Sequence, residues 1–81
     1  MSLTLKKDYV YKLNRKSDSY VFVVTDIDYE QHEIGRFSVT TKQLTKSKRN
    51  DIGHLNFWHL KVNSQGLTEL GHKDLYPEYF I

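Results

Sequence analysis

Apolar and polar residues alternate along several short stretches of the chain, which is the pattern of half-buried β-strands. The first such stretch covers residues 9–13 and places two tyrosines and a leucine on one face. The longest stretch, residues 20–29, is apolar on both faces at its start and carries Asp26 and Asp28 on one face toward its end. We therefore predict a central strand that is buried on both faces at first and half-exposed later.

Three further strands are predicted, at residues 36–41, 54–62 and 67–70, with polar segments between them. The middle one is ambiguous. As a strand, it places Leu55 and Phe57 on the face opposite to the apolar residues that follow, which needs a bulge or burial on both faces. As a helix, it would begin near residue 52 behind a polar cap. The β-rich local composition favours the strand.

The composition points to the same fold class. The chain contains no alanine, the best helix former, whereas 16 residues are Val, Ile or Thr and 11 are aromatic. Such residues suit a pleated, half-buried surface. We predict an all-β protein, either a five-stranded small barrel or a strongly twisted antiparallel sheet, with the C-terminal segment packed on it. The predicted core consists of Tyr11, Leu13, Val21, Val23, Ile27, Phe37, Val39, Trp58, Leu60, Leu70 and Leu75.

The two ends of the chain are predicted to behave differently. Residues 1–81 are expected to form a single domain. Two origins of residues 1–3 stay open, a native one and a vector-derived or disordered start, so these residues are given no weight in predicting the fold. Residues 72–81 carry five large apolar side chains and the only proline. Left exposed, they would form a patch of a size that soluble monomers avoid. This tail is therefore predicted to fold back onto the core.

The tail also carries a resemblance to a known family. Residues 75–81 (Leu-Tyr-Pro-Glu-Tyr-Phe-Ile) are similar to the closing segment of Src-homology-3 domains, and residues 56–60 resemble that family's aromatic pair. Together the two segments cover twelve of the 81 residues. The resemblance implies a five-stranded barrel with an aromatic groove for proline-rich peptides. It implies that Trp58, Pro77 and Phe80 line this groove, with Tyr9 and Tyr11 as loose counterparts of the family's aromatics near the chain start.

The net charge is only +2, but the charges are divided into two blocks. We call Asp26, Asp28, Glu30 and Glu33 the acidic block, and the segment that carries Lys42, Lys46, Lys48 and Arg49 the basic loop. Two arrangements remain open. The blocks either neutralise each other across a hairpin, or each faces the opposite block of a second copy in a two-fold dimer.

The sequence contains no clear motif for metal binding or catalysis. The acidic block lacks the glycine and the terminal glutamate of a calcium loop, and a charged strand end is the simpler interpretation. The four histidines (His32, His54, His59 and His72) lack a zinc-ligand spacing. Cysteine, a phosphate-binding glycine loop and a nucleophile motif are all missing. We expect no cofactor, no metal and no catalytic residue.

The surplus of aromatic side chains indicates protein binding, because tyrosine and tryptophan are enriched at interfaces. The leading prediction is a non-enzymatic protein-interaction module whose partner is a protein, a peptide or a second copy of the chain. Its predicted binding residues are Tyr9, Tyr11, Trp58, Pro77 and Phe80.

Two other functions stay open. The first is a small nucleic-acid-binding barrel that uses the basic loop to contact phosphates. The second is a small ribonuclease or other hydrolase whose site assembles across strands. The sequence contains no apolar run of about 20 residues and no signal segment, so a cytoplasmic location without membrane contact is expected.

Overall fold

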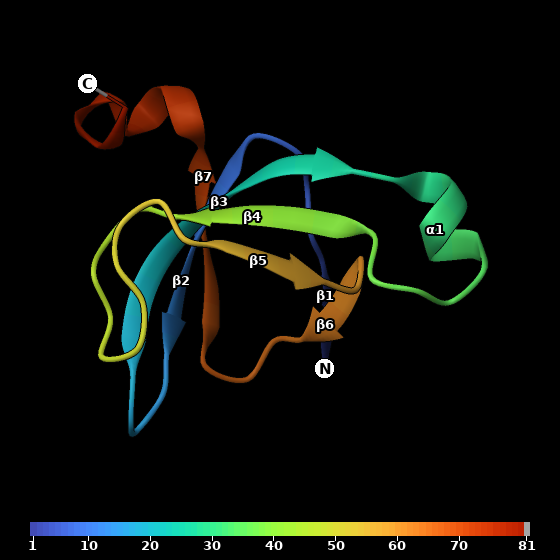
Figure 1. The fold of residues 1–81 in the computed structure, drawn as a ribbon, viewed down its shortest axis with the longest axis horizontal. Helices are drawn as coiled ribbons and strands as arrows, with labels where there is room; N and C mark the ends of the chain where they lie inside the picture. The colour runs from blue at the N-terminus through green and yellow to red at the C-terminus, as the bar shows by residue number, and fades with distance from the viewer. Residues whose placement is uncertain (81) are drawn as a thin grey trace.

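A computed structural model describes residues 1–80 as an all-β protein with seven strands in two antiparallel sheets (Figure 1). The larger sheet has the strand order β5-β4-β3-β2-β7, and the smaller sheet pairs β1 with β6. The larger sheet therefore ends in β5 on one side and β7 on the other. The strands are β1 (Ser2–Thr4), β2 (Tyr9–Asn14), β3 (Ser19–Ile27), β4 (Val39–Gln43), β5 (Leu55–Trp58), β6 (Lys61–Asn63) and β7 (Leu67–His72).

The prediction of an antiparallel β-fold is confirmed, in the form of a twisted open sheet rather than a closed barrel. Three short helical segments complete the described chain. They are α1 (Tyr29–Glu33), which follows β3, and two 3₁₀ turns after β7, η1 (Lys73–Leu75) and η2 (Pro77–Tyr79).

The inner face of the large sheet is built around a line of three aromatic rings. Phe22 of β3 stacks on Tyr11 of β2 at a centroid distance of 5.7 Å and on Trp58 of β5 at 5.2 Å. The Tyr11 hydroxyl accepts a hydrogen bond from the Lys6 amide at 2.9 Å and donates one to Glu69 Oε1 at 3.2 Å. Burial raises the pKa of Tyr11 to about 12. The phenol is thus a neutral, hydrogen-bonded part of the core.

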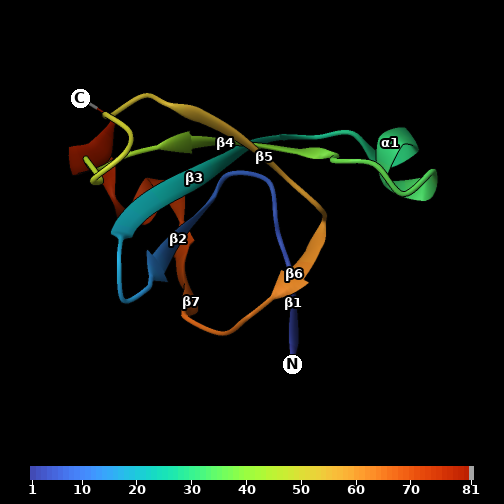
Figure 2. The same ribbon diagram turned by 60° about the horizontal axis from the view of Figure 1, so that its bottom comes forward.

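The β1–β6 ribbon covers part of this inner core. Figure 2 shows the two strands side by side. Leu5, which follows β1, is buried in the inner cluster, and its amide donates to the Leu60 carbonyl at 2.9 Å. The N-terminal residues thus form part of the small sheet, since Ser2–Thr4 pair with Lys61–Asn63.

The outer face of the large sheet carries a smaller apolar cluster. Val10, Val21, Val23 and Leu44 are buried there, and two tyrosines of the C-terminal segment pack against them. The tail therefore folds back onto the sheet, as predicted. This cover lies over the part of the outer face formed by β2 and the start of β3.

A bulge in β3 alters the predicted alternation. The pairing register between β3 and β4 shifts between Val24 and Asp26. An extra residue reverses which side chains face the core. Ile27 consequently packs with the inner cluster, whereas Val23 belongs to the outer one. Uninterrupted period-2 alternation along residues 20–29 predicts that Val23 and Ile27 share one face, and the bulge is the reason that they do not.

The ambiguous segment 54–62 forms two strands. β5 belongs to the large sheet and β6 to the small one, and Leu60 is buried at the bend between them. In the sequence, the apolar residues move to the other face after Phe57. In the structure, the chain leaves the large sheet after β5 and enters the small sheet at β6. Both a single strand and a helix are excluded for this stretch.

Two predicted core residues lie on the surface. Phe37 is 61% exposed and Leu75 is 69% exposed. The predicted strand at residues 36–41 begins only at Val39, so Phe37 lies in the connection before β4. Leu75 ends η1, and the tail turns Tyr76 rather than Leu75 toward the outer cluster.

Candidate interaction surface

The structure separates the aromatic residues that the sequence predicted as one binding site. Tyr11 is fully buried, and Trp58 stacks inward on Phe22. Tyr9 is half-buried, with the His72 ring at 5.6 Å and the Lys6 Nζ at 4.9 Å from its centroid. These three residues act mainly as supports of the fold.

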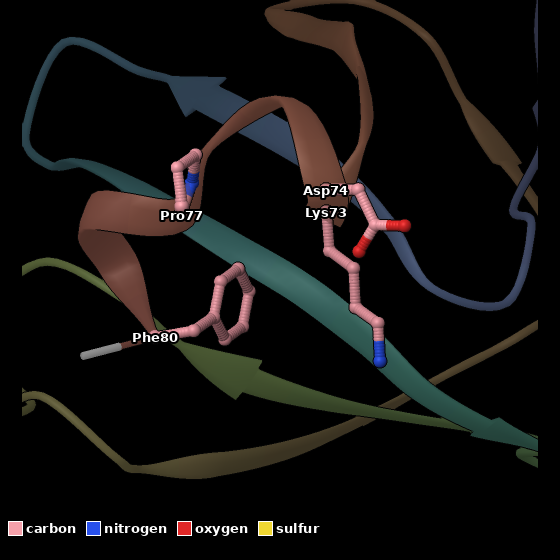
Figure 3. Close-up of a pocket in the computed structure, with 4 residues that line it drawn as sticks. All are labelled: Lys73, Asp74, Pro77 and Phe80. Atoms are coloured by element: carbon pink, nitrogen blue, oxygen red, sulfur yellow. The ribbon is translucent and has the colours of Figure 1, made fainter.

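Pro77 and Phe80 do meet at the surface. With Lys73 and Asp74 they line a hollow of about 610 Å³, which we call the C-terminal pocket (Figure 3). The Phe80 ring lies between Pro77 and the Lys73 side chain in this view. Lys73 is held by an ion pair with Asp8, at 3.5 Å between Nζ and Oδ1. The pocket combines an exposed aromatic ring with one anchored cation.

A second exposed apolar surface lies on β5 and was missed in the sequence. Leu55 is 52% exposed and Phe57 is 64% exposed. Val23 lies opposite Lys42, and Lys42 lies opposite Leu55. Directly opposed residues share a face, so Leu55 and Phe57 extend the outer face beyond the C-terminal cover. We call Leu55 and Phe57 the β5 patch.

The backbone of β5 is also free along one side. The Gln43 amide donates to the His54 carbonyl at 2.9 Å. Hydrogen-bonded pairs alternate along an antiparallel ladder, so Asn56 and Trp58 form the bonds to β4. Leu55 and Phe57 therefore direct their amides and carbonyls away from β4. Within residues 1–80 no other strand pairs with this edge.

Another aromatic contact lies beside this strand. The Phe37 and His59 rings stack at a centroid distance of 4.3 Å, and both side chains are exposed. The Ser38 amide donates to the Trp58 carbonyl at 3.0 Å, which holds the Phe37 connection next to the end of β5. Apolar surface thus continues past the strand.

The basic loop is an ordered structure built on a buried glutamine. Gln43 Nε2 donates to the carbonyls of Thr45, at 2.7 Å, and Asn50, at 3.1 Å. The Lys48 amide donates to Asp18 Oδ1 at 3.1 Å, which ties the loop to the β2–β3 hairpin. Lys46, Lys48 and Arg49 are exposed on this loop, whereas Lys42 lies on the outer face of β4. The four predicted cations are therefore split between two places.

A polar hollow of about 300 Å³ lies between the hairpin and the basic loop. Arg15 and Arg49 reach it from the two segments, and Tyr20 and Asn56 also line it. Burial raises the pKa of Tyr20, and the nearby Arg15 opposes this shift. The hollow thus places two guanidinium groups near one aromatic side chain.

The acidic block lies at the other end of the strands. Asp28 caps α1 by accepting the Gln31 amide at 3.2 Å, and α1 projects from the end of β3 opposite to the basic loop (Figures 1 and 2). Asp26, which belongs to the acidic block, lies opposite Thr40, two residues from Lys42 along β4. No ion pair joins the two blocks in the described chain. The structure therefore shows no direct neutralisation of one block by the other within residues 1–80.

Few residues converge for chemistry. In the part of the chain that the structure describes, no three His, Asp or Glu side chains come close enough to hold a metal ion. None of the described helices is long and apolar enough to cross a membrane. Searches of family models, curated proteins and solved structures found no match to this chain. The resemblance to Src-homology-3 domains stays a prediction.

Proposed function

We propose that this chain is a non-enzymatic module that binds protein through the outer face of β5. The β5 patch carries the proposal: two large apolar side chains are more than half exposed on a strand whose outward backbone groups have no strand partner within residues 1–80. Such an edge can accept an extended segment, which receives affinity from main-chain hydrogen bonds and specificity from side chains. An uncovered edge of this kind otherwise favours aggregation.

The sequence around the patch supports the proposal. Natural proteins protect a free edge with charged residues, proline or a bulge. The four residues of β5, Leu-Asn-Phe-Trp, contain none of these, and the segment from Gly53 to Leu60 has no Lys, Arg, Asp or Glu. The C-terminal pocket, with Pro77 and Phe80, opens near the same outer face (Figure 3). A bound segment would therefore meet apolar side chains on β5 and at Pro77 and Phe80, with Lys42 beside the β5 patch on the outer face.

A displayed library of random peptides tests this function. We expect peptides selected on the wild-type protein to lose binding, by about tenfold or more, when Leu55 or Phe57 is replaced by threonine, because each loses an apolar contact worth about 1.4 kcal/mol or more. Ile52→Thr is the matched control, since Ile52 is also 64% exposed but lies outside the strand. Peptides that bind all variants equally, or a library without binders, would contradict the proposal.

A second function, binding of single-stranded nucleic acid, is supported by the hollow between the hairpin and the basic loop. Arg15 and Arg49 can contact phosphates there, and Tyr20 offers a ring near them. Lys46 and Lys48 add exposed positive charge on the same loop. The acidic block lies at the far end of the sheet and does not interrupt this surface.

Salt dependence tests the second function. We expect replacement of Lys46, Lys48 and Arg49 by glutamine to weaken binding of a short single strand. The slope of log affinity against log salt should fall by about 2, since each contact contributes about 0.7. An equal loss in a control that removes the same charge elsewhere, or no binding at low salt, would contradict this role. The control replaces the exposed lysines Lys7, Lys12 and Lys61 by glutamine.

The absence of catalytic activity and a cytoplasmic location belong to the same proposal. The sequence carries no nucleophile motif, so the hydrolase alternative has no residues assigned to it. The proposed module acts by contact alone.

A further inference from the structure

We infer that the partner of the β5 patch is a second copy of this chain, which adds its own β5 in the antiparallel direction around a two-fold axis. This inference rests on the proposed function and makes it specific. The two large sheets would join into one continuous sheet, with the patches of both copies on the same outer face. Three features of the molecule lead to this arrangement.

The first feature is the set of free backbone groups. Leu55 and Phe57 each direct an amide and a carbonyl away from β4, whereas Asn56 between them does not. In an antiparallel pair of strands, a residue whose amide and carbonyl point toward the other strand must lie opposite another such residue. The two-fold register that uses all of these groups places Leu55 opposite Phe57 of the second copy, with Asn56 on the axis. Leu55 and Phe57 of each copy then each donate one backbone hydrogen bond to the other copy and accept one from it.

The second feature is the side-chain pairing that this register creates. Leu55 and Phe57 of one copy would lie beside Phe57 and Leu55 of the other on the outer face. Apolar and aromatic cross-strand pairs of this kind stabilise a sheet by about 0.2–1 kcal/mol each relative to alanine pairs. Both residues are more than half exposed in the single chain, so pairing removes apolar surface from water without rearranging the core.

The third feature is the position of the charges. The basic loop precedes β5, and the connection from α1 leads to the start of β4, which lies beside the end of β5. An antiparallel copy reverses this order. It brings the basic loop of each chain to the end of the joined sheet that carries the acidic block of the other. The two blocks, which form no ion pair with each other within the described chain, thus become complementary between two chains and steer their encounter.

Single cysteines test both the contact and its register, because the natural chain has none. In the inferred dimer the two Asn56 Cα atoms form a pair that is not hydrogen-bonded, about 4.5 Å apart, which a disulfide can span. We expect the Asn56→Cys variant to form a covalent dimer on mild oxidation. Leu55→Cys should not bridge to itself but should bridge to Phe57→Cys in a mixture. Thr68→Cys, an exposed position on the opposite edge strand β7, should stay monomeric.

Sedimentation of the unmodified chain gives an independent measurement. The strand is short, so we expect a weak dimer with a dissociation constant on the order of 10–100 µM, in the range of small transient interfaces. Phe57→Thr should weaken it by at least about tenfold, and Ile52→Thr should leave it unchanged. High salt should slow association, because the opposed charge blocks are then screened.

The outcomes separate this inference from the proposed function. An Asn56→Cys variant that crosslinks no faster than Thr68→Cys, or a chain that stays monomeric at about ten times the expected dissociation constant, would overturn the dimer. Library peptides that still need Phe57 would then leave the proposed function standing. If Leu55→Cys bridges to itself faster than Asn56→Cys does, the register is wrong and the inference fails in its stated form.

Discussion

Replacing Phe22 by alanine should lower the free energy of unfolding by about 3–5 kcal/mol, the range measured for large aromatic truncations in protein cores. Phe22 has no exposed surface and contacts three other rings, with centroid distances of 5.7 Å to Tyr11, 6.0 Å to Tyr20 and 5.2 Å to Trp58. Truncation would leave a cavity between β2, β3 and β5 that the fixed backbone of the sheet cannot close.

This loss is large for a chain of 81 residues. At about 0.05–0.15 kcal/mol per residue, the total stability is roughly 4–12 kcal/mol, so Phe22→Ala should remove at least about a quarter of it. Urea unfolding followed by tryptophan fluorescence measures the change, since Trp58 stacks directly on Phe22. Phe57→Ala is the matched control. It removes the same atoms from an exposed site and should cost much less at low protein concentration. Equal losses in the two variants would contradict the assignment of the core.

The sequence predicts the starts of β2, β3 and β7 well, whereas β4 begins three residues after the start of its predicted strand. Residues 9–13 and 20–29 were predicted as strands from alternation alone, and β2 and β3 begin within one residue of these bounds. β2 alternates because Lys12 and Asn14 face solvent, whereas residues 21–24 of β3 form a continuous apolar run because the β1–β6 ribbon covers one face and the tail the other. The bulge after Val24 could not be predicted, because one inserted residue changes the pairing without changing the composition.

The candidate site was harder to predict, because exposure depends on which surfaces distant segments cover. Tyr11 and Phe57 are both aromatic residues in alternating stretches. Tyr11 is buried because Phe22 and the β1–β6 ribbon lie over it, whereas no described segment covers Phe57. The one available signal was the change of apolar phase after Phe57, which placed Leu55 and Phe57 on a different face from Trp58. It was interpreted as a bulge or as burial on both faces.

The tail shows the opposite case, in which local composition predicted a long-range contact. Five large apolar residues in ten implied that the segment is covered, and Tyr76 and Tyr79 do pack on the outer cluster. Backbone geometry contributes to this contact. Gly71 has a positive φ of 131°, and a Cβ atom there would lie 3.0 Å from the Leu75 side chain. The turn from β7 into η1 therefore depends on a residue without a side chain.

Deleting residues 75–81 should unfold the domain or make it aggregate. The deletion removes the cover of Val10, Val21, Val23 and Leu44, together with the hydrogen bond from the Tyr76 hydroxyl to the Leu70 carbonyl at 2.9 Å. Two half-buried tyrosines contribute about 0.7–1.5 kcal/mol each by apolar burial, half of the range for a fully buried side chain. The exposed valines would also lie on an open sheet face, which favours association. Ile81 is deleted with the rest but lies outside the described residues.

A point variant keeps the experiment informative if the shortened chain cannot be purified. Tyr76→Ala should lower the thermal midpoint by about 4–24 °C, because the lost packing and the lost hydrogen bond together cost about 1–3 kcal/mol and a domain of this size shifts by about 4–8 °C per kcal/mol. Glu78→Ala, at an exposed position in the same turn, is the control and should change it little. Calorimetry at low protein concentration gives both values. A truncated chain with the wild-type midpoint, or a Tyr76→Ala midpoint equal to that of Glu78→Ala, would show that the tail only lies on the sheet and does not stabilise it.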